Sequence, residues 1–183
     1  MAGDTTFPRV WINSDVYVAP VGSTAPTNVA SSLDAAYHAV GLLSEDGLTE
    51  SREEESTDHY ARGGILVRTT RSKHKRTFKF TCLESNPTVN AIVNPGSTAT
   101  TTTGVTTRVQ YVPDPAPKAW VFEEVDGSYT RRLVIAKGEV SNVGEVKSND
   151  GEMTMFELTV TVYPSTAGVL YREITNDPAA AES

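Results

Sequence analysis

Cysteine is nearly absent from this sequence, because Cys82 is the single cysteine among 183 residues. One cysteine excludes an internal disulfide and a zinc site built from cysteine ligands. Long apolar runs are missing too, and none approaches the roughly 20 residues that a membrane-spanning helix needs. The first residues, Met1 to Asp4, lack the basic and apolar regions of a signal peptide. We therefore expect synthesis in a reducing cytoplasm and no membrane partner.

Leucine is also scarce, with 9 residues against 24 threonines and 21 valines. Branched Cβ atoms are stiff in a helix and pack well on a pleated sheet, so this ratio predicts a mainly β fold. The length is about one domain's worth, and we expect a single domain over residues 1–183. Basic residues are outnumbered by acidic ones, 16 against 23, and the net charge of −7 argues against a general affinity for nucleic acid.

Sequence motifs of catalysis and ligand binding are missing as well. The three histidines, His38, His59 and His74, lack metal-binding spacing, and no nucleophile elbow, phosphate loop or dinucleotide fingerprint occurs. Glu123 and Glu124 are adjacent, so in a strand they would point to opposite faces and could not act as a carboxylate pair. We expect no enzyme activity, no cofactor and no bound metal.

Alternating apolar residues predict strands in several places. From residue 153 to 163, one face holds Phe156, Leu158, Val160 and Val162, and the other holds Glu157, Thr159, Thr161 and Tyr163. A similar alternation from residue 76 to 84 puts Cys82 on the apolar face, where a cysteine is usually a small buried hydrophobe. A third strand is predicted from residue 9 to 19.

Two short helices are also predicted. Ser31 or Ser32 would cap the first helix, which would end at Gly41. Asn86 would cap the second, with Pro87 at its first position and an apolar stripe over the following turns.

Asp-Gly pairs predict tight turns between strands. They lie at residues 46–47, 126–127 and 150–151. The clearest predicted hairpins join residues 120–125 to 129–137 and residues 139–147 to 152–163. The threonine-rich segment 97–107 is predicted to be an edge strand or a mobile loop, and a flexible tail is expected from about residue 177.

The most informative feature is a reversal of charge along the chain. Residues 45–58 hold seven acidic residues and one basic residue, whereas residues 62–79 hold seven basic residues and no acidic one. The two blocks could neutralise each other as the strands of a hairpin within one subunit. Each block could instead meet the opposite block of the next copy, head to tail. Contacts of that second kind close into rings or propagate as filaments.

The candidate residues for contact between copies are three acids and four bases in these blocks: Glu53, Glu54, Glu55, Arg71, Lys73, Lys75 and Arg76. The basic stretch from residue 71 to 76 could also contact the phosphates of a nucleic acid. It contains no aromatic residue on which a base could stack, and the acidic block is close in sequence. Both observations argue against nucleic-acid binding by this stretch.

Several segments together carry a resemblance to a known family. Residues 41–51 are GLLSEDGLTES and precede the acidic run, and residues 77–86 are TFKFTCLESN and precede the second predicted helix. Weaker matches follow at residues 137–140, KGEV, and residues 157–164, ELTVTVYP. In their order and spacing, these segments resemble the major tail tube protein of long, non-contractile-tailed bacteriophages.

The resemblance implies a structural virion protein with a β-sandwich or barrel of antiparallel strands and a flanking short α-helix, assembled as a hexameric ring. In this family the rings stack into a hollow tube that conducts the genome, and a long loop between early strands reaches toward an adjacent ring. Residues 44–76 match that loop by position and length. The implied partners are further copies of the chain, the tape measure protein, the tail terminator, the distal tail proteins and, transiently, the passing DNA. The implied location is the virion tail, after assembly in the host cytoplasm.

In such a tube, the polar face of the strand near residue 160 could line the lumen or could meet outside solvent. Its candidate lumen residues are Glu157, Thr159 and Thr161. Six copies at −7 each would give a ring a charge of about −42, over which DNA could slide without binding. Two other functions stay open. One is a single-ring tail terminator or adaptor, and the other is a monomeric β-domain that binds a ligand or nucleic acid through residues 71–76.

Overall fold

The computed structural model describes residues 8–151 and 153–178, which form ten strands and one short helix. The strands are β1 (Asn13–Pro20), β2 (His38–Ala39), β3 (Thr49–Ala61), β4 (Ile65–Cys82), β5 (Thr98–Thr102), β6 (Val105–Val109), β7 (Lys118–Asp126), β8 (Tyr129–Val143), β9 (Phe156–Val162) and β10 (Arg172–Thr175). Helix α1 (Pro87–Val93) lies between β4 and β5. The predicted mainly β fold of antiparallel strands with a flanking helix is confirmed. In the part of the chain that the structure describes, no helix is long and apolar enough to cross a membrane.

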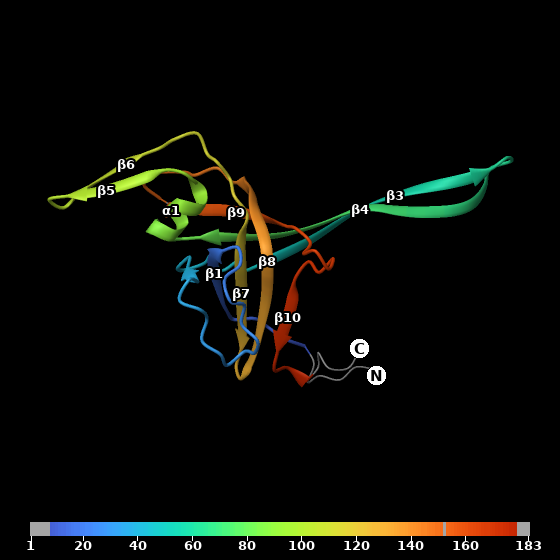
Figure 1. Cartoon of the computed structure of the whole chain (residues 1–183), viewed down its shortest axis with the longest axis horizontal. Helices are drawn as coiled ribbons and strands as arrows, with labels where there is room; N and C mark the ends of the chain where they lie inside the picture. Colours follow the sequence, from blue (N-terminus) through green and yellow to red (C-terminus); the bar gives the residue numbers. More distant parts are fainter. Residues whose placement is uncertain (1–7, 152, 179–183) are drawn as a thin grey trace.

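One antiparallel sheet holds eight of the strands, in the order β2-β1-β7-β8-β9-β4-β3 with β10 also paired to β8. The strands β5 and β6 form a separate two-stranded sheet. The first part of β8 pairs with β7 and β10, and its last part pairs with β9. In Figure 1, β9 and β4 cross the direction of β1, β7 and β8. The sheet thus folds over itself into two crossing layers, as in an orthogonal sandwich.

The main core lies between these layers and is rich in aromatic rings. Phe78 of β4 stacks on Phe122 of β7 with ring centroids 5.1 Å apart. Phe80 of β4 meets both Trp120 and Phe122 edge-on. Cys82 continues the same face of β4 and is fully buried, as predicted. These aromatic contacts join β4 to β7, two strands that do not pair with each other. They therefore fix the position of one layer on the other.

Helix α1 confirms the second predicted helix. Asn86 Oδ1 accepts a hydrogen bond from the Val89 backbone N–H at 2.9 Å, and Pro87 lies in the first turn. Val89 and Ile92 are buried in the main core. Asn86 Nδ2 also donates to the Val40 carbonyl at 2.8 Å, which ties the start of the helix to the chain after β2.

The first predicted helix is wrong, because the segment between β1 and β2 is irregular. Asp34 Oδ1 accepts from the Ala36 N–H at 2.9 Å, and Asn28 Oδ1 accepts from the Ser31 N–H at 2.6 Å. Such local side-chain bonds give the backbone an alternative to a helix. Gly41, which was expected to end the helix, has a φ of 91° and lies beyond β2.

This irregular segment covers the second face of β1, β7 and β8. It contributes to a smaller apolar cluster made of Ala19, Tyr37, Ala119, Val121 and Val134. The Arg132 guanidinium of β8 donates to the carbonyl oxygens of Asn28 at 2.8 Å and Ser31 at 2.7 Å, and pairs with Glu123. A buried cation from the sheet therefore fixes the path of the covering segment.

The predicted turns are confirmed in part. The Asp126-Gly127 turn joins β7 to β8. The next hairpin is shorter than predicted, because β8 ends at Val143 and β9 begins at Phe156. The Asp150-Gly151 pair lies in the long loop between them and not in a tight turn. The threonine-rich segment forms the β5–β6 hairpin, which pairs with no other strand of the described chain.

The two ends of the described chain meet each other. Arg9 Nε and Nη2 donate to the two carboxylate oxygens of Asp177, each at 2.7 Å, and its guanidinium lies 4.2 Å from the Tyr129 ring centroid. Asp177, near which the flexible tail was predicted to begin, is buried. The rest of that predicted tail, from residue 179, lies outside the described residues. The strand predicted from residue 9 begins later, at Asn13.

Candidate functional site

The strands β3 and β4 extend far beyond the body of the molecule as a two-stranded ribbon (Figure 1). Residues 76–82 of β4 pair with β9 as well as β3, whereas residues 65–75 pair with β3 alone. We name the projecting part, residues 53–75, the arm. All of β3 is exposed to solvent. The charged segment predicted at about residues 44–76 thus forms a long hairpin that carries the arm.

The acidic and basic blocks face each other along the arm. Three pairs bridge its strands: Lys73 with Glu55 at 2.7 Å, His74 with Glu54 at 3.3 Å and Lys75 with Glu53 at 3.7 Å. Exposed pairs of this kind typically stabilise a protein by less than about 1 kcal/mol. The structure shows the first of the two arrangements considered from the sequence, pairing within one subunit. Pairing between copies stays a proposal.

The remaining two candidate contact residues differ from each other in their surroundings. Arg71 is exposed and lies opposite Ser56 in the ladder. Arg76 lies at the base of the arm, where its side chain is 18% exposed and pairs with Glu50. The seven candidates therefore divide into six residues on the arm and one residue at its base.

Two irregularities interrupt the ladder of the arm. Lys73 and His74 of β4 lie opposite the single residue Glu54 of β3, and a second shift of register occurs next to Tyr60. Lys73 has a φ of 58°, in the left-handed region that residues with a Cβ adopt seldom. An extra residue on one strand bends the ladder and increases its twist. The curvature of the arm in Figure 1 fits this arrangement.

The end of the arm is apolar, a feature that the analysis of charge missed. The exposed fractions are 61% for Tyr60, 67% for Ile65, 52% for Leu66 and 67% for Val67. We name these four residues the apolar tip. Large apolar side chains that gather on a surface mark contact sites. The signal in the sequence is an apolar tripeptide, Ile65-Leu66-Val67, within the most charged part of the chain.

The polar face of β9 carries the predicted lumen residues. The residues Phe156, Leu158, Val160 and Val162 are buried, and Glu157, Thr159 and Thr161 on the other face are half-buried. Glu157 pairs with Lys79 of β4 at 2.8 Å, and Thr161 Oγ1 donates to Ser141 Oγ of β8 at 2.8 Å. Hydroxyl groups and one balanced ion pair thus form a polar surface across three strands. Its position along a lumen stays a proposal.

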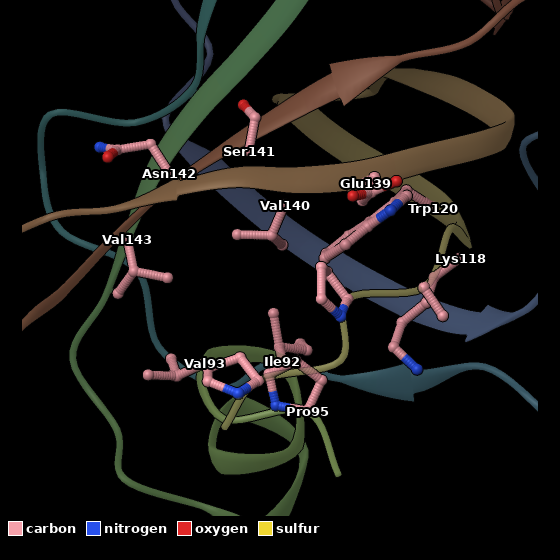
Figure 2. Close-up of a pocket in the computed structure, with 13 residues that line it drawn as sticks. Ile92, Val93, Pro95, Lys118, Trp120, Glu139, Val140, Ser141, Asn142 and Val143 are labelled. Carbon is pink, nitrogen blue, oxygen red and sulfur yellow. The ribbon is translucent and has the colours of Figure 1, made fainter. Parts of the chain in front are cut away.

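A groove of about 300 Å³ lies between α1, the proline-rich connector after β6, and β8 (Figure 2). Its apolar lining includes Ile92, Val93, Trp120, Val140 and Val143. Its charged members are Lys118 and Glu139, which lie on the same side of the close-up. The groove offers apolar contact surface, and its lining contains no cysteine or histidine.

Titratable side chains do not gather into a metal site in the described residues. No group of three or more histidine, cysteine, aspartate and glutamate side chains there could hold a metal ion. Burial raises the pKa of the Cys82 thiol to about 12, so the thiol stays protonated at neutral pH. The histidines lie on β2, β3 and β4, and His59 Nε2 contacts the Thr70 hydroxyl at 3.0 Å.

Similarity to known proteins agrees with this architecture. The family model described as phage tail tube protein matches residues 1–183. A chain from the extended sheath–tube complex of the PVC extracellular contractile injection system is 7% identical with a TM-score of 0.50, and the match covers 96% of this chain and 99% of that chain. A chain from the anti-feeding prophage cap structure, the AFP tube terminating cap, is 6% identical with a TM-score of 0.51, and the match covers 96% of each chain. At such identities the two structures show a shared fold alone. No curated protein matches the sequence.

Proposed function

Because this chain belongs to the phage tail tube protein family and is thus a structural protein of a tail, we propose that its copies form stacked hexameric rings around a genome channel. The resemblance to tail tube proteins is confirmed by the family match. The two solved structures that share the fold come from a contractile injection system and an anti-feeding prophage. A long, non-contractile tail therefore stays part of the proposal, as does the lack of any catalytic activity.

The observation that carries the proposal is the arm. It leaves the body as two strands that pair only with each other, and it ends in the apolar tip. An isolated two-stranded hairpin is marginally stable in water, so a long arm gains much from a surface to lie on. A neighbouring copy would cover the tip and the charged sides of the arm together.

The shape of the subunit favours a contact between unlike surfaces. In Figure 1 the arm and the β5–β6 hairpin point to opposite sides of the body. We propose that the tip contacts a surface of the neighbour other than the neighbour's own tip. Such heterologous contacts produce rings when they close and filaments when they do not. Stacked rings combine both outcomes in one assembly.

The proposed lumen residues are Glu157, Thr159 and Thr161, on the polar face of β9. A net charge of −7 per copy supports an inner wall that does not hold DNA phosphates. A solved tube with a clearly basic inner wall would end this part of the proposal. The further proposed partners are the tape measure protein, the tail terminator and the distal tail proteins, with transient contact to the passing DNA.

Electron microscopy of purified protein at high concentration tests the assembly directly. We expect tubes with a central channel in negative stain. Rings of a single height would favour the tail terminator or adaptor instead. Solitary particles, both in concentrated protein and in intact virions, would overturn the proposal.

Charge reversal on the arm tests its role in stacking. We expect Lys73→Glu with Lys75→Glu to leave the subunit folded and to block tube growth, because both side chains are exposed on the arm. Arg76 is left unchanged because it lies at the base. The matched control is Lys147→Glu, an exposed lysine in the loop between β8 and β9. Normal tubes from the double variant would refute the role of these charges.

The rival function is a monomeric domain that binds nucleic acid through residues 71–76. In the structure, four side chains of this stretch pair with acids of β3, which lowers its local positive charge. A gel-shift titration at physiological salt, with particle size measured on the same sample, separates the two functions. Binding by a monomer would favour the rival.

A further inference from the structure

Three polar side chains form a closed cluster where the arm joins the body. Arg76 Nη1 of β4 donates to the Glu50 carboxylate of β3 and, at 3.0 Å, to the Tyr171 hydroxyl oxygen. The Tyr171 hydroxyl donates in turn to Glu50 Oε1 at 3.2 Å. Tyr171 precedes β10, so the cluster joins the hairpin to the C-terminal part of the chain. We name these three residues the base cluster.

The base cluster lies at the point where β4 loses one of its two neighbours. Arg76 is the outermost residue of β4 that pairs on both sides, with Arg52 of β3 and Val162 of β9. Glu50 pairs with Phe78, the first core residue of β4, and therefore lies on the same face as the core. The cluster therefore lies over the end of the core that is next to the arm.

Arg76 is the sheltered member of the cluster, and Tyr171 attaches the cluster to the core. The Arg76 side chain is 18% exposed, against 74% for Lys73 and 49% for Lys75. The Tyr171 ring meets Phe78 edge-on with centroids 5.5 Å apart, and the Arg76 guanidinium lies 5.4 Å from the Tyr171 ring centroid. Charge-assisted hydrogen bonds in partly buried positions are stronger and more directional than ion pairs on an open surface.

Strand pairing between β3 and β4 does not favour an arginine at position 76. Arg52 lies directly opposite Arg76, and like charges in that position destabilise a pair of strands. The contacts of Arg76 with Glu50 and Tyr171 offset this repulsion and give the side chain a role outside the ladder. This role differs from that of the exposed lysines on the arm.

We propose that Glu50, Arg76 and Tyr171 are positioning residues that fix the direction in which the arm leaves the body. A two-stranded ribbon twists and bends readily, so a small change of angle at its base would move the apolar tip far from its place. Arg76 is thereby assigned to the base of the arm and not to the contact between copies. The direction of the arm is a property of one subunit and does not depend on the proposed function. Only the effect of a displaced tip on tube growth rests on the proposed function.

The test measures the direction of the arm in dilute protein that has not assembled. Spin labels are attached at Arg62→Cys, in the turn of the arm, and at Ser128→Cys, in the β7–β8 turn. The native Cys82 is fully buried and stays unlabelled. The compared variants are Arg76→Gln and Tyr171→Phe, and the matched control is Lys75→Gln on the adjacent, more exposed residue.

We expect one narrow distribution of distances between the labels in the parent protein and in the Lys75→Gln control. Arg76→Gln and Tyr171→Phe should broaden the distribution at unchanged melting temperature of the body. Amide exchange of residues 50–53 should become about tenfold faster, the factor expected for losing a hydrogen bond to a charged group. The charge swap Glu50→Arg with Arg76→Glu should narrow the distribution again.

A distribution that is already broad in the parent, or equally narrow in all variants, would overturn the proposal. Should Arg76→Gln fail to fold, Tyr171→Phe decides alone, because it keeps the ring on Phe78 and removes only the hydroxyl. The outcome is separate from the proposed function. If the base cluster fixes the arm in a protein that never forms tubes, the positioning role of the cluster is supported and the proposed tube is refuted.

Discussion

Gly138 has no room for a side chain. A Cβ atom there would lie 2.9 Å from Val160 Cγ1 and 3.1 Å from Trp120 Cδ1. The Trp120 indole also donates to the Gly138 carbonyl at 3.0 Å, so the ring cannot move away without losing that bond. We expect Gly138→Ala to lower the free energy of unfolding by about 1–3 kcal/mol, measured in urea.

The control for this change is Gly151→Ala in the loop before β9. The nearest atom to a Cβ at that position lies 3.9 Å away, so we expect almost no loss of stability. Equal losses for the two variants would contradict the account of the core around Trp120.

Cys82 provides a second test at the scale of one residue. Burial raises its pKa from 9.0 to about 12, so the folded chain holds the thiol proton more tightly than the unfolded chain does. This residue therefore stabilises the fold fully below pH 9.0 and loses that contribution as the pH rises toward 12. At pH 8 we expect alkylation by iodoacetamide at least about a hundredfold slower in native protein than in urea. Rapid labelling of native protein would contradict the buried position.

Single residues were predictable where the deciding contacts are local. Asn86 caps α1 because its side chain reaches an N–H three residues along, which a short stretch of sequence reveals. Asp34 and Asn28 are residue types that suit a helix cap and a turn equally well. Whether this segment forms a helix or a turn depends partly on the hydrogen bond from Arg132 to the Asn28 carbonyl. The two residues lie more than 100 positions apart, so the sequence does not reveal this contact.

Helix α1 is the element whose stability depends most clearly on one side chain. Removing the Asn86 amide leaves the Val89 N–H and the Val40 carbonyl without their partner. We expect Asn86→Ala to cost about 1 kcal/mol of stability in urea unfolding. Ala91→Ser, on the exposed side of the same helix, should cost less than about 0.5 kcal/mol. A smaller effect at Asn86 than at Ala91 would contradict the role of the cap.

Among the strands, periodicity predicted those with one buried face. β9 and the inner part of β4 alternate because one face of each meets the core. The arm has no buried face, so its sequence carries no alternation that would reveal how far β3 and β4 extend. Its existence and its approximate length, residues 44–76, were predicted from charge and from the family resemblance, whereas its apolar tip was not.

For the whole molecule, the apolar tip provides the most direct test of assembly. Ile65 and Val67 are each 67% exposed, so Ile65→Ser with Val67→Ser should change the stability of the subunit by less than about 0.5 kcal/mol. If the tip is buried against a neighbour, the same change should raise the protein concentration needed for tube growth by about tenfold or more.

The control is Val112→Ser on the connector, where the side chain is 90% exposed. We expect this variant to form tubes at the concentration of the parent protein, as measured by light scattering and negative stain. Unchanged growth for the tip variant would assign the contact to another surface.

The crossing of the two layers and the base cluster could not be predicted from the sequence. Glu50 and Tyr171 lie 121 positions apart, and neither belongs to a pattern that singles it out. Their meeting depends on the turn of the sheet at β8, which follows from the packing of many side chains together.

The Arg9–Asp177 pair places the beginning and the end of the described chain at one corner of the body. A short peptide could therefore bridge the two ends, and new ends could be opened at the β5–β6 turn without cutting the folded core. Segments joined to the chain before Arg9 and after Asp177 would leave the body at this same corner.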